Sequence, residues 1–304
     1  MARCMPGAKG ENPGRAVRVA GQVAAREALG SMIWLTVRVP GWPGAKAGQF
    51  AMLHPDVSAC FLPRAFSVAS QTGEEVSFLI APIGAGTNEL GRMNPGDRVW
   101  VTGPLGRGFD ETALLATATG AGPTPAPPAP RIVIVAGGVG AAPFPLLLDR
   151  LGAAISGEAL DVLVLLGFRD EVQAEGAAPV TAAAARLVAA GATCRVEVAT
   201  EDGSNGPPQL VTDLLAAEQR AGDRVAACGP RAMSAAVWQL CNKVPGTTAW
   251  FSLEAGMACG VGSCHGCAMT LADGSTARVC RDGPVFSGAA VFGAGPTFGG
   301  GATR

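Results

Sequence analysis

The sequence predicts an antiparallel β-barrel, then an α/β domain with a doubly wound parallel sheet, then a small C-terminal lobe. Three observations support this fold class. Alternating apolar runs separated by Gly, Pro and Asn fill residues 16–112, which is typical of short antiparallel strands. From Arg131, strand-like runs alternate with helical ones, which favours a parallel sheet covered on both faces. Residues 250–292 carry four closely spaced cysteines, which indicates a metal-binding lobe.

The barrel is predicted from six strand-like runs within residues 16–112. In order, they are RVAGQVAAREAL, MIWLTVRVP, QFAMLHP, RAFSVAS, EVSFLIAPI and DRVWVTGPL. Residues 1–15, which precede them, are polar, contain Gly and Pro, and are predicted to be disordered. Residues 113–130 lack charge and periodicity, and they predict a low-complexity linker, ALLATATGAGPTPAPPAP.

The α/β domain is predicted over residues 131–249. Its strand-like runs are RIVIVAGG, DVLVLLGFR, ATCRVEVAT and RVAACGP. Its helical runs are AAPFPLLLDRLGAA, the Ala-rich residues 178–190, QLVTDLLAAEQ and RAMSAAVWQLCNKV. The cysteine lobe follows over residues 250–292, and the Gly-rich residues 293–304 are predicted to form a flexible tail.

The composition argues against several function classes. A formal net charge of −1 gives no basis for binding nucleic acid or a membrane surface. Gly and Pro interrupt the apolar stretches before they reach the roughly 20 residues of a membrane-spanning helix. The N-terminal residues lack the apolar segment of a secretion signal. We therefore expect a cytoplasmic protein with reduced thiols at Cys4, Cys60, Cys194, Cys228 and Cys241.

Cys259, Cys264, Cys267 and Cys280 are the most informative residues of the chain. They form the pattern C-x4-C-x2-C-x12-C, whose first three cysteines have the plant-type spacing of a [2Fe–2S] cluster. Glycines between them allow a short loop to curl around inorganic sulfide. The alternative is a structural zinc site, and with it a zinc-stabilised binding module. Zinc sites favour two pairs of closely spaced ligands, so three cysteines in one loop favour the cluster.

Two motifs in the barrel predict a site for FAD. The run RAFS places the cation of Arg64 beside the hydroxyl of Ser67, and GAGT follows some twenty residues later. Arg64 would neutralise the diphosphate, Ser67 would hydrogen-bond the flavin, and the amides of Gly86 and Thr87 would bind phosphate oxygens at a helix N-terminus. Taken singly, such an arginine is most often a solvated surface residue and GAGT a turn. Their order and spacing favour the dinucleotide.

A glycine-rich turn in the α/β domain predicts a second nucleotide site, for NAD. It follows the first buried strand and precedes a helix, but it lacks the complete G-x-G-x-x-G fingerprint. A tight turn that only glycine permits is therefore the alternative. Cys228, at the end of the fourth strand, would lie near the nicotinamide, and a buried structural cysteine is its alternative. Arg169 would either pair with the 2′-phosphate of NADP or remain a surface cation. The residues expected to bind NAD are Gly137, Gly138, Gly140, Cys228, Gly229 and Pro230.

The chain resembles the ferredoxin reductase superfamily in a series of motifs. They are RAFS, GAGT, GDRVWVTGPLGRGF, AGGVGAAPF, CGP, and SLEAGMACGVGSCHGCAM followed by RVCRDGPVF. Over residues 16–288, it resembles the electron-transfer subunits of NAD-linked dihydroorotate dehydrogenase in particular. The gap of twelve residues before Cys280 fits the compact lobe of that family. Phe66 stands where many superfamily members have Tyr, so it can stack on the flavin but cannot donate a phenolic hydrogen bond.

The resemblance implies FAD in the barrel, NAD in the α/β domain and a [2Fe–2S] cluster in the lobe. It implies that electrons pass from the FMN of a catalytic partner subunit through cluster and FAD to NAD+, as dihydroorotate becomes orotate in pyrimidine biosynthesis. The expected assembly is a heterotetramer of two plus two subunits, and no acid–base or nucleophilic residue is expected in this chain. The alternative is a reductase subunit of a glutamate synthase, hydrogenase or transhydrogenase complex. The residues implied for FAD are Arg64, Ala65, Phe66, Ser67, Leu79, Ile80, Ala81, Gly86 and Thr87.

Overall fold

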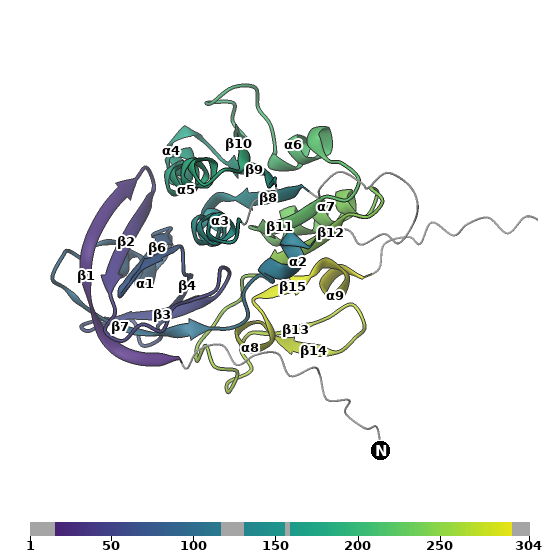
Figure 1. Ribbon diagram of the computed structural model, residues 1–304. Coiled ribbons are helices and arrows are strands. Elements are labelled where there is room, and N and C mark those ends of the chain that lie inside the picture. The colour runs from purple at the N-terminus through teal and green to yellow at the C-terminus, as the bar shows by residue number, and fades with distance from the viewer. Residues whose placement is uncertain (1–15, 117–130, 156–158, 294–304) are drawn as a thin grey trace, which may run out of the picture.

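The computed structural model describes residues 16–116, 131–155 and 159–293. The predicted disordered N-terminus, most of the predicted linker and the predicted tail after Gly293 lie outside these described residues. The first residues of the predicted linker belong to a short helix, Glu111–Leu115. Figure 1 shows a barrel-like sheet, an α/β layer structure beside it, and a small lobe of paired strands below the α/β sheet.

The first part is a seven-stranded sheet in the order β4-β3-β7-β1-β2-β6-β5, and all of its strand pairs are antiparallel. Its interior is built by alternation: in β2, Leu35 and Val37 are fully buried, whereas Trp34 and Thr36 between them are half-buried. Helix α1 (Ala85–Gly91) connects β6 to β7. The strands are β1 (Val17–Leu29), β2 (Met32–Arg38), β3 (Phe50–Pro55), β4 (Arg64–Ser67), β5 (Ser70–Thr72), β6 (Glu75–Ile80) and β7 (Arg98–Leu105).

The second part is a six-stranded sheet in the order β10-β9-β8-β11-β12-β15. Five of these strands are parallel, and β15 pairs antiparallel with β12. Figure 1 shows α3 and α5 on the face towards the barrel and α6 and α7 on the opposite face, as expected for a doubly wound sheet. The strands are β8 (Ile132–Gly137), β9 (Asp161–Phe168), β10 (Thr193–Thr200), β11 (Arg224–Cys228), β12 (Thr248–Ser252) and β15 (Val285–Ser287).

Four long helices and several short ones connect these strands and the parts of the chain around them. The four long helices are α3 (Phe144–Ala153), α5 (Ala178–Ala189), α6 (Val211–Glu218) and α7 (Arg231–Cys241). The shorter ones are α2 (Glu111–Leu115), which follows the barrel, η1 (Gly138–Ala141), α4 (Glu171–Ala174) and η2 (Glu175–Ala177).

The third part is built around the cysteines. It contains the hairpin of β13 (Ala268–Thr270) and β14 (Thr276–Arg278), followed by α8 (Val279–Asp282) and α9 (Gly288–Phe292). Strands β12 and β15, from residues that the sequence analysis assigned largely to the lobe, extend the α/β sheet instead. The lobe is therefore attached at both ends to one edge of that sheet.

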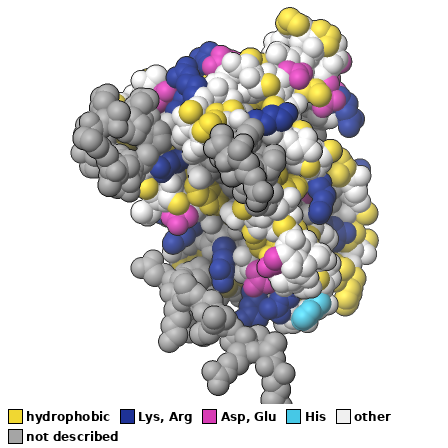
Figure 2. All heavy atoms as spheres, turned by 90° about the vertical axis from the view of Figure 1, so that its right-hand side faces the viewer, with side chains coloured by type: hydrophobic (Ala, Val, Ile, Leu, Met, Phe, Trp, Pro, Cys, Tyr) yellow, Lys and Arg dark blue, Asp and Glu magenta, His cyan; other side chains and the backbone are white. Residues whose placement is uncertain are grey.

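The three parts share buried apolar surface. One core cluster runs from the barrel interior into α3, α5 and one face of the parallel sheet, and the rings of Phe109 and Phe144 lie 5.9 Å apart where the two meet. Figure 2 shows basic and acidic side chains interspersed on the face that includes the lobe. Such mixing agrees with the net charge of −1. Within the described residues, no helix has the length and apolar character needed to cross a bilayer.

Candidate functional site

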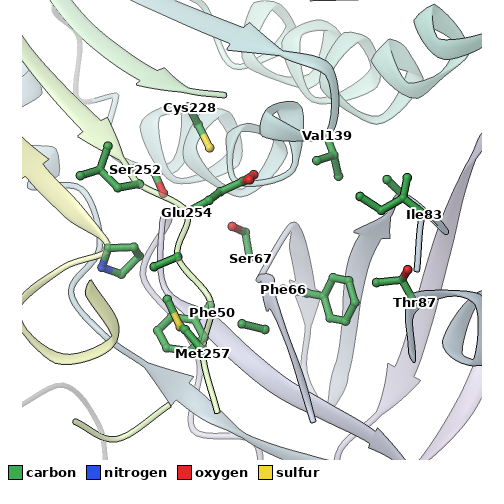
Figure 3. Close-up of a pocket in the computed structure, with 15 residues that line it drawn as sticks. Phe50, Phe66, Ser67, Ile83, Thr87, Val139, Cys228, Ser252, Glu254 and Met257 are labelled. Atoms are coloured by element: carbon green, nitrogen blue, oxygen red, sulfur yellow. The ribbon is translucent and has the colours of Figure 1, made fainter. Parts of the chain in front are cut away.

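A pocket of about 230 Å³ lies where the barrel, the α/β sheet and the lobe meet. Figure 3 shows Phe66 and Ser67 of β4 on its barrel side and Cys228 of β11 on the opposite side. Six residues predicted to bind FAD or NAD line this one pocket, so the structure brings the two predicted nucleotide sites together. They are Ala65, Phe66, Ser67, Ala81, Thr87 and Cys228.

Arg64 lies directly over the first turn of α1. A Cβ atom built on Gly86 would come within 2.7 Å of the Nε, Cζ and Nη2 atoms of Arg64, so only glycine allows the guanidinium to lie there. The guanidinium also donates to the carbonyl of Leu62 at 2.6 Å. Thr87 caps the helix start, because its hydroxyl accepts from the N–H of Gly84 at 2.9 Å. A cation and free backbone N–H groups therefore face the same space, as a diphosphate requires.

Leu79 and Ile80 take a different place from the other residues predicted for FAD. Their side chains are almost completely buried in the core that the barrel shares with the α/β sheet. Only their backbone groups remain available to a ligand, whereas Ala81, the next residue, lines the pocket.

The glycine-rich turn after β8 packs tightly against the end of β11. A Cβ atom on Gly140 would lie 2.3 Å from the carbonyl oxygen of Cys228, and one on Gly137 would lie 3.0 Å from Cδ of Pro230. Gly138 has φ of +56°, a left-handed value that favours glycine. Packing and backbone conformation thus account for these glycines structurally. The same packing places the turn beside the pocket, where the neighbouring Val139 forms part of the wall.

Cys228 and Glu254 form the polar wall opposite the barrel. Burial raises the pKa of the Cys228 thiol to about 12, with the carboxyl group of Glu254 adding to the effect. Burial also raises the pKa of Glu254. Figure 3 shows the Glu254 side chain between Cys228 and Ser67. The sequence analysis did not select Glu254, and the signal it missed is an acidic residue two positions after a buried strand, β12.

The four predicted metal ligands approach one another in two pairs. Cys259 and Cys264 lie within hydrogen-bonding reach, and the N–H of Cys264 donates to Cys259 and lowers its pKa to about 6. Cys280 adjoins Cys267, whose sulfur accepts the N–H of Cys280 at 3.4 Å. Burial raises the pKa of Cys280 to about 12. No disulfide joins the described cysteines.

This donor set fits a binuclear cluster, in which two thiolates bind each of two irons. Among the described residues, no group of three or more His, Cys, Asp or Glu surrounds the position of a single ion. Backbone conformation suits a tight loop, because Gly260, Gly262 and also His265 have positive φ values of 70°, 83° and 60°. The side chains of Cys267 and Cys280 are buried and Cys264 is exposed, so one end of the site faces solvent.

The cysteine site and the pocket share a wall. Phe50 and Ala65 line the pocket and also pack in the buried cluster that contains Cys267 and Cys280. Met257 does the same from the segment that leads into the cysteine loop. Side chains of one cluster therefore border both the thiols and the pocket, which suits electron transfer between groups bound at the two places.

Comparisons with known proteins agree with this arrangement. Residues 254–292 match the family model for the iron–sulfur cluster binding domain of dihydroorotate dehydrogenase B. The chain is 33% identical over 245 residues to the electron transfer subunit of dihydroorotate dehydrogenase B (NAD(+)) from Clostridium perfringens, covering 81% of this chain and 86% of the relative. It is 34% identical to the subunit of that name from Caldanaerobacter subterraneus, covering 81% and 87%.

Solved structures show the same fold. The structure of NADH-dependent reduced ferredoxin–NADP oxidoreductase aligns with a TM-score of 0.68 at 23% identity and covers 89% of each chain. A ferredoxin–NADP+ reductase from Neisseria gonorrhoeae with bound FAD and NADP aligns with a TM-score of 0.55 at 17% identity, over 73% of this chain and 89% of that one.

Proposed function

This chain belongs to the family of electron transfer subunits of NAD-linked dihydroorotate dehydrogenase B, and we propose that it conducts electrons between a catalytic partner subunit and NAD+. The observation that carries the proposal is the shared wall between the cysteine site and the pocket. The partner would contain FMN, oxidise dihydroorotate to orotate, and form a heterotetramer of two plus two subunits. The relatives' names favour this function over a glutamate synthase-, hydrogenase- or transhydrogenase-type reductase.

When bound, FAD supplies the exchange between single electrons and a hydride, and a [2Fe–2S] cluster supplies single-electron transfer. The chain's own residues bind and orient these groups. Arg64 would neutralise the diphosphate of FAD, and Phe66 and Ser67 would hold the flavin from the barrel side. Cys228, a neutral thiol, forms the opposite wall, where the nicotinamide would enter. The raised pKa of Glu254 means that its carboxyl group retains a proton to higher pH than an exposed one would.

The NAD molecule would extend from the pocket along the carboxyl edge of the parallel sheet. With nicotinamide near Cys228 and phosphates near η1, the adenosine would reach the loops after β9 and β10, because the sheet order is β10-β9-β8-β11. These two loops are joined: the N–H of Asp202 donates to the carbonyl of Arg169 at 3.1 Å, and the N–H of Glu171 donates to Ser204 Oγ at 2.7 Å.

The charge of these joined loops favours NAD over NADP. The two loops contain four carboxylates besides the cation of Arg169, so the negative charge exceeds the positive charge. The additional 2′-phosphate of NADP would be repelled by this excess. The pKa of Asp202 is lowered, chiefly by the hydroxyl of Ser204, so this carboxylate is ionised at neutral pH. The four carboxylates belong to Asp170, Glu171, Glu201 and Asp202.

Anaerobic titration of the purified chain with NADH tests the proposal. Flavin and cluster absorbance should both bleach, and NADPH should act much more weakly. Iron and acid-labile sulfide in equal amounts would exclude the zinc-stabilised module. Co-purification with the catalytic subunit, followed by a dihydroorotate:NAD+ assay, tests the reaction and the subunit ratio. A preparation that holds neither iron nor flavin after oxygen-free reconstitution would refute the proposal.

A further inference from the structure

The cysteine site is divided between two segments that must be held together. Three cysteines lie in the cysteine loop, residues 259–267, and Cys280 lies in α8, beyond the β13–β14 hairpin. The loop has no regular secondary structure of its own. Three contacts of backbone N–H groups join the segments. The N–H of Val279 donates to the carbonyl of Cys267 at 3.1 Å, the N–H of Cys280 donates to the Cys267 sulfur at 3.4 Å, and the backbone of Gly262 hydrogen-bonds the thiol of Cys280. The first two are at the C-terminal end of the loop, and the third is a single contact in its middle.

We propose that Arg278 is a positioning residue, which holds the middle of the cysteine loop against α8 and places a positive charge beside the cluster. Its Nη1 atom donates to the carbonyl oxygen of Gly262 at 3.0 Å. Gly262 lies between Cys259 and Cys264, and Arg278 lies two residues before Cys280. The side chain thus adds a second contact to the middle of the loop, which is otherwise joined to α8 through the hydrogen bond between the Gly262 backbone and Cys280. The inference rests on the proposed function, because it assumes that a cluster binds here.

Asp282 fixes the direction of the Arg278 side chain. One carboxylate oxygen of Asp282 accepts the backbone N–H of Arg278 at 2.8 Å and lies 3.6 Å from its Nε atom. The guanidinium is planar and has several donors, so Nε can face Asp282 while Nη1 reaches Gly262. The Arg278 side chain is 24% exposed, so solvent screens it less than it screens a surface arginine.

The backbone at Gly262 is closely packed and has a left-handed conformation. A Cβ atom on Gly262 would come within 3.0 Å of Cδ of Arg281, so the stem of Arg281 packs closely on this part of the loop. Gly262 has φ of +83°, a backbone conformation that residues other than glycine rarely adopt, and this conformation sets the direction of its carbonyl. The carbonyl that Arg278 binds is therefore presented by backbone geometry, and Arg278 is the described side chain that donates to it.

The charge of Arg278 acts on the redox equilibrium. A cluster held by four thiolates becomes more negative by one charge when it is reduced, so a half-buried cation nearby favours the reduced form. Replacing Arg278 by Met removes that cation and leaves the negative charge of Asp282 in place. The reduction potential of the cluster should therefore fall. A residue that only stabilised the fold would not shift the potential in this way.

The test compares Arg278→Met, Arg278→Lys and wild type, each purified with both cofactors in the absence of oxygen. The control is Arg38→Met, which removes an exposed barrel arginine that pairs with one carboxylate, Glu75. Two quantities are measured: the rate of iron release to a chelator, and the cluster potential from a dye-equilibrated titration. Flavin absorbance and the melting temperature report on the rest of the protein.

Arg278→Met should release iron about tenfold faster, the lower end of the effect of removing a residue that orients metal ligands. Its potential should be lower than that of wild type, with FAD and melting temperature unchanged. Arg278→Lys keeps the charge and one donor and should stay close to wild type, as should Arg38→Met. If Arg278→Met does not accumulate, Arg278→Gln replaces it and should lower the potential while iron release changes less.

Three results would overturn the inference: wild-type iron release and potential in Arg278→Met, equal impairment in Arg278→Met and Arg278→Lys, or loss of FAD together with iron. An unchanged potential in Arg278→Gln would overturn the role of the charge. Failure of the proposed function is distinguishable, because it would show as a wild-type chain that binds no iron and sulfide.

Discussion

The substitution Gly86→Ala tests how the barrel binds the diphosphate of FAD. The added Cβ atom would lie within 2.7 Å of the guanidinium of Arg64, so the side chain of Arg64 must move away. Gly86 is in the first turn of α1 and does not have a positive φ, so the backbone itself accepts Ala. In a helix, Ala is favoured over Gly by about 1 kcal/mol. The protein without FAD should therefore be as stable as wild type or more so, while FAD binding weakens.

The size of the effect follows from the contact that is lost. A hydrogen bond from a charged donor contributes about 1.5–3 kcal/mol, which corresponds to a Kd for FAD raised about 10-fold to 100-fold. Fluorescence quenching during titration of FAD into the flavin-free chain measures this Kd. Gly91→Ala is the matched control in the same helix, since its Cβ atom would make ordinary contacts of 3.4 Å with Pro82 and 3.5 Å with Ile33.

A double-mutant cycle shows whether the effect passes through Arg64. Once Arg64→Met has removed the guanidinium, adding Gly86→Ala should change the Kd for FAD very little. Fully additive effects would mean that Gly86 acts independently of Arg64. Wild-type affinity in Gly86→Ala would mean that Arg64 does not contact the diphosphate, and the assignment of the barrel site would fail.

The remaining predictions concern the other parts of the molecule. Cys264→Ser should lose iron and sulfide but keep FAD, measured by metal analysis and flavin absorbance, and retention of a normal cluster would contradict the ligand assignment. Glu201→Lys should lower the preference for NADH over NADPH, as kcat/KM, by about tenfold, because the charge near the 2′ position changes by two units; an unchanged ratio would place the adenosine elsewhere. Arg131→Met should lower the free energy of unfolding by about 3 kcal/mol, measured by urea denaturation. The carboxylate of Asp223 is only 1% exposed, and the substitution removes the guanidinium that lies 2.8 Å from it. The double variant Arg131→Met/Asp223→Leu should regain part of the lost stability, because it no longer buries an unpaired carboxylate. A double variant as unstable as Arg131→Met would argue against the unpaired carboxylate as the cause.

The residues that could be predicted from the sequence are those whose spacing alone carries the chemistry. The spacing of Cys259, Cys264 and Cys267 indicates a cluster loop without knowledge of the fold. The barrel and the parallel sheet follow from periodicity, and structural neighbours confirm that fold class. The run RAFS predicts an FAD site because a cation, a ring and a hydroxyl at that spacing favour one kind of ligand, and its last three residues line the pocket.

Other features depend on contacts between distant segments. Glu254 is part of the pocket wall because β12 lies beside β11 in the sheet, and an acidic residue after a short strand does not reveal that neighbour. Strand β15 has only three residues and joins the sheet through pairing with β12, so periodicity could not identify it. The sequence predicts that Gly140 binds phosphate. In the structure, a Cβ atom at this position would collide with the carbonyl of Cys228, so close packing also requires glycine there.

Strand β3 explains why the position of the lobe could not be predicted from the sequence. It also explains how the two candidate sites come together. Its side chains alternate: Ala51 and Leu53 face the shared core of the barrel, whereas Phe50 and Met52 pack in the cluster that contains buried cysteines. A strand buried on both faces has a continuous apolar sequence, here FAML, which does not say what covers each face. The lobe covers the outer face, where a Cβ atom on Gly260 would lie 2.7 Å from Cγ of Met52.

Because Phe50 also lines the pocket, one strand supplies the wall that both sites share. The short path between thiols and pocket is therefore a consequence of barrel folding. It requires the lobe to lie against β3, and Phe286 of β15 packs in the same cluster from the α/β sheet. A change that loosened the lobe from β3, such as a bulkier residue at Gly260, would lengthen that path while leaving the cysteine spacing intact.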